Sequence, residues 1–332
     1  MWVDPRQLFR KSSMGRHTSY RVTAKKSVLF SANSQMTADA ILATSYVSTA
    51  RLHALPVAPK ASVIVVTYNN DSLLEETLRS LERQTISEFE ILILDNNDSI
   101  DIADTVSRYA ASYIKLKRNF GVNVGRNVGA AYASSEIVIF LDDDAIVPAD
   151  FVAAHIHAHL HLGIYGLRGK CIPKTKSIYN ALAQHYDLGE QIVPFYNNLE
   201  GNSSYNRGFL LSIGGFAPKL WGHEGIELTA RAVETCGDAG RFIYYPEAVI
   251  YHDYADSFRK YFKKVLRHTR NARQLIAESD RLHPFIMGYS KLSLPQPPRL
   301  SLPNRIQLRL LRKFTNVLVR LYLKYERYSL RA

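Results

Sequence analysis

The chain has 332 residues, of which 46% are hydrophobic, so it is long enough for one large domain or two small ones with a packed core. Its net charge of +12 is concentrated at the ends, because residues 1–60 carry nine Lys or Arg against two Asp or Glu, and residues 299–332 carry nine against one. The slightly acidic body excludes a basic nucleic-acid-binding domain, the two cysteines exclude a disulfide framework, and no apolar stretch is long enough to span a bilayer.

Residues 1–58 lack hydrophobic periodicity, so we expect a basic, flexible N-terminal extension that is either a plain tail or a targeting segment. Order should begin at Ala61, where a β-branched run that is apolar on both faces indicates a central parallel strand. We predict strands at 61–67, 89–94, 113–116 and 137–141, and helices at 71–84 (with Asp71 or Ser72 as its cap), 99–112 and 119–134. This alternation predicts an α/β fold with a parallel sheet, whose ligands lie at the carboxyl ends of its strands.

The second half of the chain is less regular. We predict a helix at 149–162, strands near 164–172 and 208–213, a helix at 224–236, a strand at 241–251 and a basic helix at 256–278. Residues 281–303 are rich in proline and are predicted to be a linker, and 304–332 are predicted to be a basic amphipathic helix.

Asp142-Asp143-Asp144 follows the buried strand 137–141 directly. Three adjacent carboxylates repel one another, and the alternation of side chains along a strand sends Asp142 and Asp144 to the same side. These two can share one divalent cation through oxygen ligands, whereas the simpler alternative is an acidic turn that caps the next helix. His252 ends another apolar strand and would complete such a site as a neutral imidazole.

Residues 118–129 combine glycines, asparagines and two arginines. Glycine permits close backbone approach, a helix N-terminus attracts phosphate and arginine clamps it, so this segment is a candidate phosphate site. The alternative is a tight loop whose glycines serve only the turn and the packing of the helix.

Two carboxylates three residues apart, Glu224 and Glu227, open the predicted helix 224–236 and share one of its faces. One of them can be the general base for an acceptor hydroxyl, or both can be favourable charge at a helix N-terminus. Trp221, just before them, is either a core residue or a platform on which a sugar ring stacks.

Together these motifs resemble family 2 glycosyltransferases of the GT-A fold, over roughly residues 61–260. The motifs that carry the resemblance are Thr67-Tyr68-Asn69, Asp95, Asn119-x-Gly121, Gly125-Arg126-Asn127-x-Gly129, Asp142-Asp143-Asp144, Gly214-Gly215-Phe216 and Trp221-Gly222-x-Glu224-x-x-Glu227. The last of them is also similar to the Trp-Gly-Gly-Glu segments of polypeptide N-acetylgalactosaminyltransferases and β-1,4-galactosyltransferases, which have a metal-binding histidine downstream, as His252 is here.

The resemblance implies a GT-A (Rossmann-like) α/β fold: a mixed, mostly parallel sheet flanked by helices, with a C-terminal helical extension. It implies a catalytic domain at 59–280, with a nucleotide-binding half at 59–145 and an acceptor half at 146–280.

The resemblance also implies the site residues. Those for the nucleotide-sugar are Thr67, Tyr68 and Asp95 on the base and ribose, with Asn69, Asn119, Gly125, Arg126, Asp142 and Asp143 nearby. Those for Mn²⁺ or Mg²⁺ on the diphosphate are Asp142, Asp144 and His252. Trp221 and His223 would contact the acceptor.

The implied reaction moves a sugar from a nucleotide-sugar, which we expect to be UDP-linked, to a hydroxyl of a glycan or lipid-linked acceptor. Glu224 is the expected base, with Glu227 as the second choice. Family membership implies inversion at the anomeric carbon, although the N-acetylgalactosaminyltransferase-like features belong to retaining enzymes, which leaves the stereochemistry open.

The most serious departure from the family pattern is Gly225, which stands where an aspartate usually follows the glutamate. It keeps a non-catalytic glycan-binding or scaffold protein as an alternative. A sugar-phosphate nucleotidyltransferase is the other alternative, but Tyr68-Asn69-Asn70 lacks the glycine and arginine of the phosphate loop in that class.

The predicted C-terminal helix carries a broad apolar stripe bordered by Arg and Lys. Such a helix can lie on anionic lipid, or its stripe can pack on the catalytic domain. We expect a cytoplasmic protein that binds the inner face of the plasma membrane through residues 304–328 and has no nucleic-acid partner.

Overall fold

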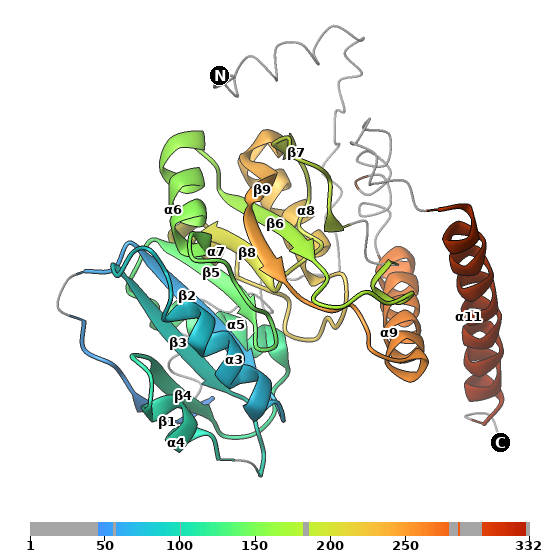
Figure 1. Cartoon of the computed structure of the whole chain (residues 1–332), viewed down its shortest axis with the longest axis horizontal. Helices are drawn as coiled ribbons and strands as arrows, with labels where there is room; N and C mark the ends of the chain where they lie inside the picture. The colour runs from blue at the N-terminus through green and yellow to red at the C-terminus, as the bar shows by residue number, and fades with distance from the viewer. Residues whose placement is uncertain are drawn as a thin grey trace, which may run out of the picture.

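The computed structural model describes residues 46–55, 58–99, 101–181, 186–278, 285 and 301–329. Within them, a nine-stranded mixed sheet has the strand order β1-β4-β3-β2-β5-β8-β6-β9-β7 (Figure 1). The strands are β1 (Val47–Arg51), β2 (Ala61–Thr67), β3 (Phe89–Asp95), β4 (Ser112–Leu116), β5 (Ile137–Asp142), β6 (Gly166–Ile172), β7 (Val193–Pro194), β8 (Asn202–Asn206) and β9 (Phe242–Tyr251). The helices are α3 (Asp71–Leu81), α4 (Ala103–Ser107), α5 (Val122–Tyr132), α6 (Phe151–Leu162), α7 (Arg207–Ser212), α8 (Glu224–Cys236), α9 (Phe258–Glu278) and α11 (Leu302–Ser329).

Strands β4, β3, β2 and β5 form the parallel half of the sheet, as predicted. They are apolar on both faces because helices cover both: α3 and α6 contribute to the core on one side, and α5, α7 and α8 to the core on the other. The register pairs Thr67 with Asp95 and Val66 with Asp142, so β2, β3 and β5 end at one edge. That edge carries the polar residues that the sequence places after each strand.

The prediction of a strand near 208–213 is wrong, because α7 covers Arg207–Ser212. The Asn206 side chain accepts the Phe209 N–H at 2.8 Å and so caps this helix. The strand is β8, the polar run Asn202–Asn206, which pairs antiparallel with β5 and β6 in the middle of the sheet. Its burial comes from its neighbours rather than from its own composition, which is why no apolar pattern marks it.

Two predicted helices are shorter than expected. The helix predicted over 99–112 is reduced to α4, because Ser112 already pairs with Leu92 in the sheet. Helix α3 begins at Asp71, so neither Asp71 nor Ser72 caps it; the cap position is Asn70, whose side chain donates to Asp143 instead.

The N-terminal extension predicted over 1–58 includes a strand. Residues 47–51 form β1, which adds to the edge of the sheet antiparallel to β4, so the flexible arm does not reach residue 58. Tyr46 packs edge-on against Phe120 at 4.8 Å between ring centroids and anchors the entry to this strand. Residues 1–45 lie outside the described residues.

The C-terminal helices α9 and α11 lie side by side at one end of the molecule (Figure 1). Leu266 of α9 packs against Val319 and Leu323 of α11, and Tyr261 packs against Leu308. Most of the linker predicted over 281–303 lies outside the described residues. In the described part of the chain, no helix is long and apolar enough to cross a membrane.

Candidate active site

The three residues predicted as metal ligands meet at the carboxyl edge of the sheet. Asp142 ends β5, Asp144 follows in the next turn, and His252 comes directly after β9; one ligand atom of each lies within 4.8 Å of the others. His252 Nε2 is 3.0 Å from Asp144 Oδ1. Two carboxylates and an imidazole on separate elements fit the ligand set of a divalent ion such as Mn²⁺.

The contact between His252 and Asp144 affects the pKa of both side chains. Burial alone would raise the pKa of the Asp144 carboxyl, but the hydrogen bond and charge of His252 hold this pKa below its usual value. Burial opposes a charged imidazole, yet the hydrogen bond to Asp144 raises the pKa of His252 to about 10. As the predicted neutral ligand, His252 would bind a metal through its unprotonated ring nitrogen.

Asp143 points away from this group, as strand alternation predicts. Its Oδ1 accepts from Asn70 Nδ2 at 3.0 Å, and burial raises the pKa of its carboxyl to about 6. Its backbone carbonyl accepts from Thr77 Oγ1 at 3.0 Å, which ties the acidic turn to α3. Asp143 therefore belongs to the packing between α3 and β5 rather than to the metal group.

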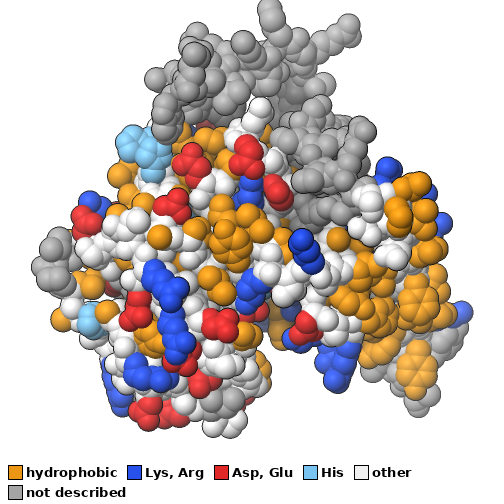
Figure 2. Space-filling model, viewed as in Figure 1, with side chains coloured by type: hydrophobic (Ala, Val, Ile, Leu, Met, Phe, Trp, Pro, Cys, Tyr) orange, Lys and Arg blue, Asp and Glu red, His pale blue; other side chains and the backbone are white. Residues whose placement is uncertain are grey.

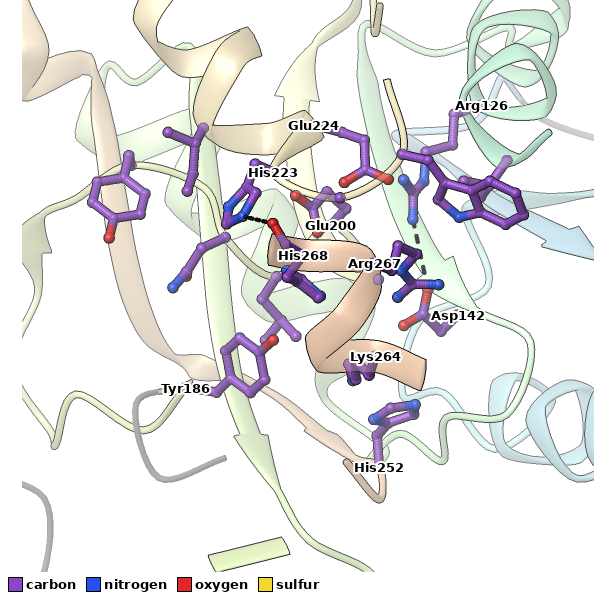
Figure 3. A pocket seen from close by; sticks show the side chains of 18 residues that line it. Arg126, Asp142, Tyr186, Glu200, His223, Glu224, His252, Lys264, Arg267 and His268 are labelled. Atoms are coloured by element: carbon purple, nitrogen blue, oxygen red, sulfur yellow. Dashed lines mark hydrogen bonds and ion pairs between the residues drawn. The ribbon is translucent and has the colours of Figure 1, made fainter. Parts of the chain in front are cut away.

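A cavity of about 440 Å³ opens beside the metal group (Figure 3). Residues from α5, the turn before β8, the start of α8 and α9 line it. Its charged and aromatic lining residues are Arg126, Asp142, Tyr186, Tyr196, Glu200, Trp221, His223, Glu224, His252, Lys264, Arg267 and His268. Cations and carboxylates thus face one open cavity, as a site for a charged small molecule requires.

Arg126 reaches this cavity, whereas Gly125 does not. The Arg126 guanidinium is 3.7 Å from Asp142 Oδ1 and lies over the Phe216 ring at 5.4 Å. Gly125 faces the sheet: an added Cβ there would lie 2.6 Å from Val66 Cγ1. Gly125 therefore serves the packing of α5 on the sheet, and its contact with a nucleotide stays a prediction.

The residues predicted to hold the base and ribose do not line the cavity. Asp95 is fully buried; its carboxylate accepts from the Asn97 backbone and side chain, from Tyr113 Oη at 2.7 Å and from Lys115 Nζ at 2.9 Å. This carboxylate holds β3 and β4 together, and its role in nucleotide binding stays a prediction.

The remaining predicted nucleotide residues lie around the same strand ends. Thr67 is fully buried, and Tyr68 is 47% exposed. Asn69 adopts a left-handed backbone with φ of 56° and donates its N–H to Asn97 Oδ1 at 2.5 Å. Asn119 is exposed, and its Oδ1 accepts from Asn96 and from the Gly121 N–H. Of these residues, Tyr68, Asn69 and Asn119 are exposed and could contact a nucleotide.

The two candidate bases have different surroundings. Glu224 lines the cavity, at the first turn of α8. Glu227 is fully buried and pairs with Arg231 at 2.9 Å, and Arg231 also donates to the carbonyls of Ile213 and Gly215. Glu227 therefore fixes α8, through Arg231, to the loop after α7, and Glu224 is the better placed of the two candidate bases.

The predicted acceptor residues stand at the cavity. Trp221 is 59% exposed, and the Arg267 guanidinium lies 6.0 Å from its ring. His223 starts α8 with a left-handed φ of 64°, and its Nε2 is 3.3 Å from the His268 carbonyl (Figure 3). An exposed indole at a cavity mouth is a surface on which a sugar ring can stack.

Three charged residues of the cavity belong to no motif in the sequence: Glu200, Lys264 and Arg267. The last two belong to α9, and its basic composition was the available signal. Burial lowers the pKa of Lys264 to about 8, and its ammonium lies 3.8 Å from the Tyr254 ring. No sequence pattern indicated Glu200, because the strand was predicted near 208–213, whereas β8 begins at Asn202.

Known proteins show which family these features belong to. Residues 62–214 match the family Glycosyl transferase family 2. A GalNAc(5)-diNAcBac-PP-undecaprenol beta-1,3-glucosyltransferase of Campylobacter jejuni is 38% identical over 92 residues, 26% of this chain and 30% of that protein. The Escherichia coli UDP-Glc:alpha-D-GlcNAc-diphosphoundecaprenol beta-1,3-glucosyltransferase WfgD is 29% identical over 143 residues, 39% of this chain and 56% of that protein.

A solved structure agrees on the fold. The crystal structure of S. aureus TarS 1-349 in complex with UDP-GlcNAc matches with a TM-score of 0.50 at 18% identity, and covers 68% of this chain and 71% of that chain. The chain spans less than two thirds of the length of the curated relatives that it matches. The matched region contains the parallel strands, Arg126, the aspartate triplet and β8, and we conclude that residues 62–214 are a glycosyltransferase family 2 region within a GT-A fold.

Proposed function

We propose that this protein transfers a sugar from a UDP-linked donor to a hydroxyl of a glycan or lipid-linked acceptor, with a divalent metal. The observation that carries the proposal is the Asp142, Asp144 and His252 group at the edge of a cavity that also holds Glu224. The relatives support the substrates: the names of both specify an undecaprenol-linked acceptor, and that of WfgD specifies UDP-glucose.

The cations of the cavity face the donor diphosphate in this proposal. Arg126 projects from α5 and lies beside Asp142, while Lys264 and Arg267 project from α9. A bound divalent ion would stabilise the negative charge that develops on the departing diphosphate. The cationic side chains add to that stabilisation from the opposite walls of the cavity.

Glu224 is the proposed base. It lines the cavity close to the exposed ring of Trp221, where an acceptor sugar would stack. The acceptor oxygen bonds to the anomeric carbon, its proton moves to the base, and the bond from that carbon to the diphosphate breaks with its electron pair on the nucleoside diphosphate. This arrangement favours a transferase over a scaffold protein, because buried carboxylates and cations that face one cavity are costly without a charged ligand.

Thermal denaturation of the full chain with UDP-, GDP- and dTDP-sugars, with and without Mn²⁺, tests this proposal. We expect UDP-sugar with Mn²⁺ to raise Tm by about 5 °C at 100 times Kd, and either one alone to raise it less. No shift with any nucleotide-sugar in a folded protein would refute the donor class. A shift that is equal with and without Mn²⁺ would refute the metal dependence.

We also propose that α11 binds an anionic membrane surface. Its stripe at Ile306, Leu310, Phe314, Val317, Leu321 and Tyr325 is more than half exposed at every position. Leu308, Val319 and Leu323, on a different face, make the apolar contacts with α9, and of the stripe Phe314 lies beside Phe258 of α9 at 5.9 Å between ring centroids. The high exposure of the stripe favours lipid over packing on the catalytic domain. Figure 2 shows hydrophobic side chains gathered over this end of the molecule.

The positive charge of α11 indicates which kind of surface its apolar stripe binds. The basic residues of α11 include Arg305, Arg309, Arg312, Lys313, Arg320 and Lys324, so an apolar stripe bordered by cations suits anionic lipid. Helix α9, on which α11 packs, carries Lys264 and Arg267 into the cavity on another side. A membrane under α11 would therefore lie one helix away from the cavity, which suits a lipid-linked acceptor at the inner face of the plasma membrane.

Leu310→Gln should weaken binding to phosphatidylglycerol-containing vesicles about tenfold or more, because the side chain is 62% exposed and its burial in lipid is lost. Co-flotation of the full chain measures this. Asn316→Gln, at an exposed position on the same helix, is the matched control and should bind as the wild type does. Equal binding to neutral vesicles, equal binding by both variants, or a wild-type dimer that Leu310→Gln dissociates would contradict the membrane assignment.

A further inference from the structure

Glu200 is a charged residue of the cavity for which the proposed reaction has no role so far. It stands in the turn just before β8, beside Gly201, whose carbonyl accepts the Asp142 N–H at 3.2 Å. Its Oε1 accepts the Gly225 N–H at 2.7 Å, in the first turn of α8. Among the described residues, no protein group is hydrogen-bonded to its other carboxylate oxygen, and the side chain lines the cavity (Figure 3).

The fit between Glu200 and Gly225 explains why residue 225 has no side chain. A Cβ at position 225 would lie 2.8 Å from Glu200 Oε1 and 2.9 Å from the carbonyl of Asn197. Asn197 cannot move away easily, because its N–H donates to Thr229 Oγ1 and its side chain to Tyr205 Oη. The carboxylate of Glu200 thus occupies the space beside the start of α8 that a side chain at position 225 would need.

The charges around Glu200 are those of a functional site. Burial, and next the charge of Glu224, raise the pKa of its carboxyl to about 7, while the guanidinium of Arg126 acts in the opposite direction. A carboxylate that served only to cap a helix N-terminus would be stabilised in its ionised form. Two neighbouring carboxyls that line one cavity cost stability, and such pairs are typical of sites that exchange protons.

We propose that Glu200 is a second catalytic carboxylate, which acts with Glu224 as a pair to take the proton from the acceptor hydroxyl. This inference rests on the proposed transferase function. As the acceptor oxygen bonds to the anomeric carbon and the diphosphate leaves with its electron pair, the hydroxyl proton passes to the carboxyl pair. The Gly225 N–H holds Glu200 in place for this step.

Glu200→Gln separates this role from a structural one. Glutamine keeps an oxygen that can accept the Gly225 N–H, but it cannot take a proton. We expect kcat for sugar transfer to fall by about 100-fold or more, while the donor Kd and Tm stay at wild-type values. Glu76→Gln, on the exposed face of α3, is the matched control and should retain wild-type kcat.

The double variant Glu200→Gln/Glu224→Gln tests the pairing. If the two carboxyls act as a unit, the double variant loses little more kcat than the worse single variant. A kcat for Glu200→Gln within threefold of the wild type overturns the inference and leaves the transferase function intact. A loss of kcat together with a fall in Tm of more than about 5 °C also overturns the inference, because it would show that Glu200 only stabilises the start of α8. A folded wild type without transfer activity overturns both.

Discussion

Replacing Glu224 with glutamine is expected to abolish sugar transfer while the protein still binds its donor. Glu224 lines the cavity but is not part of the Asp142, Asp144 and His252 group, so its loss removes a proton acceptor without removing a contact to the diphosphate. General base catalysis contributes about 100- to 10,000-fold, and kcat should fall by that factor. Release of UDP during transfer measures kcat, and calorimetry measures the donor Kd.

The control for this experiment is again Glu76→Gln, which removes one carboxylate from an exposed helix face. A folded Glu224→Gln protein with kcat within tenfold of the wild type would remove Glu224 as the base. Because Glu227 is fully buried against Arg231, it could not then take over that role, and Glu200 would remain as the candidate.

The second large effect is expected for Asp144→Asn. This change removes a carboxylate ligand and the partner of His252, so the dependence of donor binding on Mn²⁺ should disappear. A metal contributes several kcal/mol of transition-state stabilisation, so kcat should fall by about 100-fold or more. Calorimetric titration of Mn²⁺ in the presence of UDP measures the first effect, and turnover measures the second.

The adjacent aspartate provides a matched control. Asp143→Asn makes the same chemical change one residue earlier, where the side chain turns toward Asn70 rather than toward His252. This variant should keep its Mn²⁺ affinity. If Asp143→Asn lost Mn²⁺ binding and Asp144→Asn retained it, the assignment of ligands by strand alternation would be wrong.

Local patterns were sufficient for the part of the site that lies at strand ends. Apolar β-branched runs mark β2, β3 and β5, and parallel strands bring their carboxyl ends to one edge. The alternation of side chains then separates Asp142 and Asp144 from Asp143, and His252 follows from the end of β9. These features depend on the periodicity of single elements, which can be read along the chain.

Contacts between distant segments decided what the patterns did not show. Asp95 has the same position at a strand end as Asp142, yet Tyr113 and Lys115 of the next strand bury and saturate it. Gly125 belongs to a glycine-rich segment with a phosphate-site composition, yet Val66 of β2 fills the space beside it. In both cases, a side chain from another element determines whether the residue faces the cavity or the core.

The sequence alone therefore determined the fold class, the parallel half of the sheet and the amphipathic C-terminal helix, and it singled out Asp142, Asp144, His252 and Glu224, because each depends on a local run or period. Only the tertiary structure decided that polar β8 is a central strand, that Glu227 is buried against Arg231, and that Glu200, Lys264 and Arg267 line the cavity. The physical reason is that burial and electrostatic surroundings are set by neighbours far away in sequence. Glu200 and Gly225 illustrate this: neither is remarkable alone, and the 2.7 Å hydrogen bond between them exists only in the folded chain.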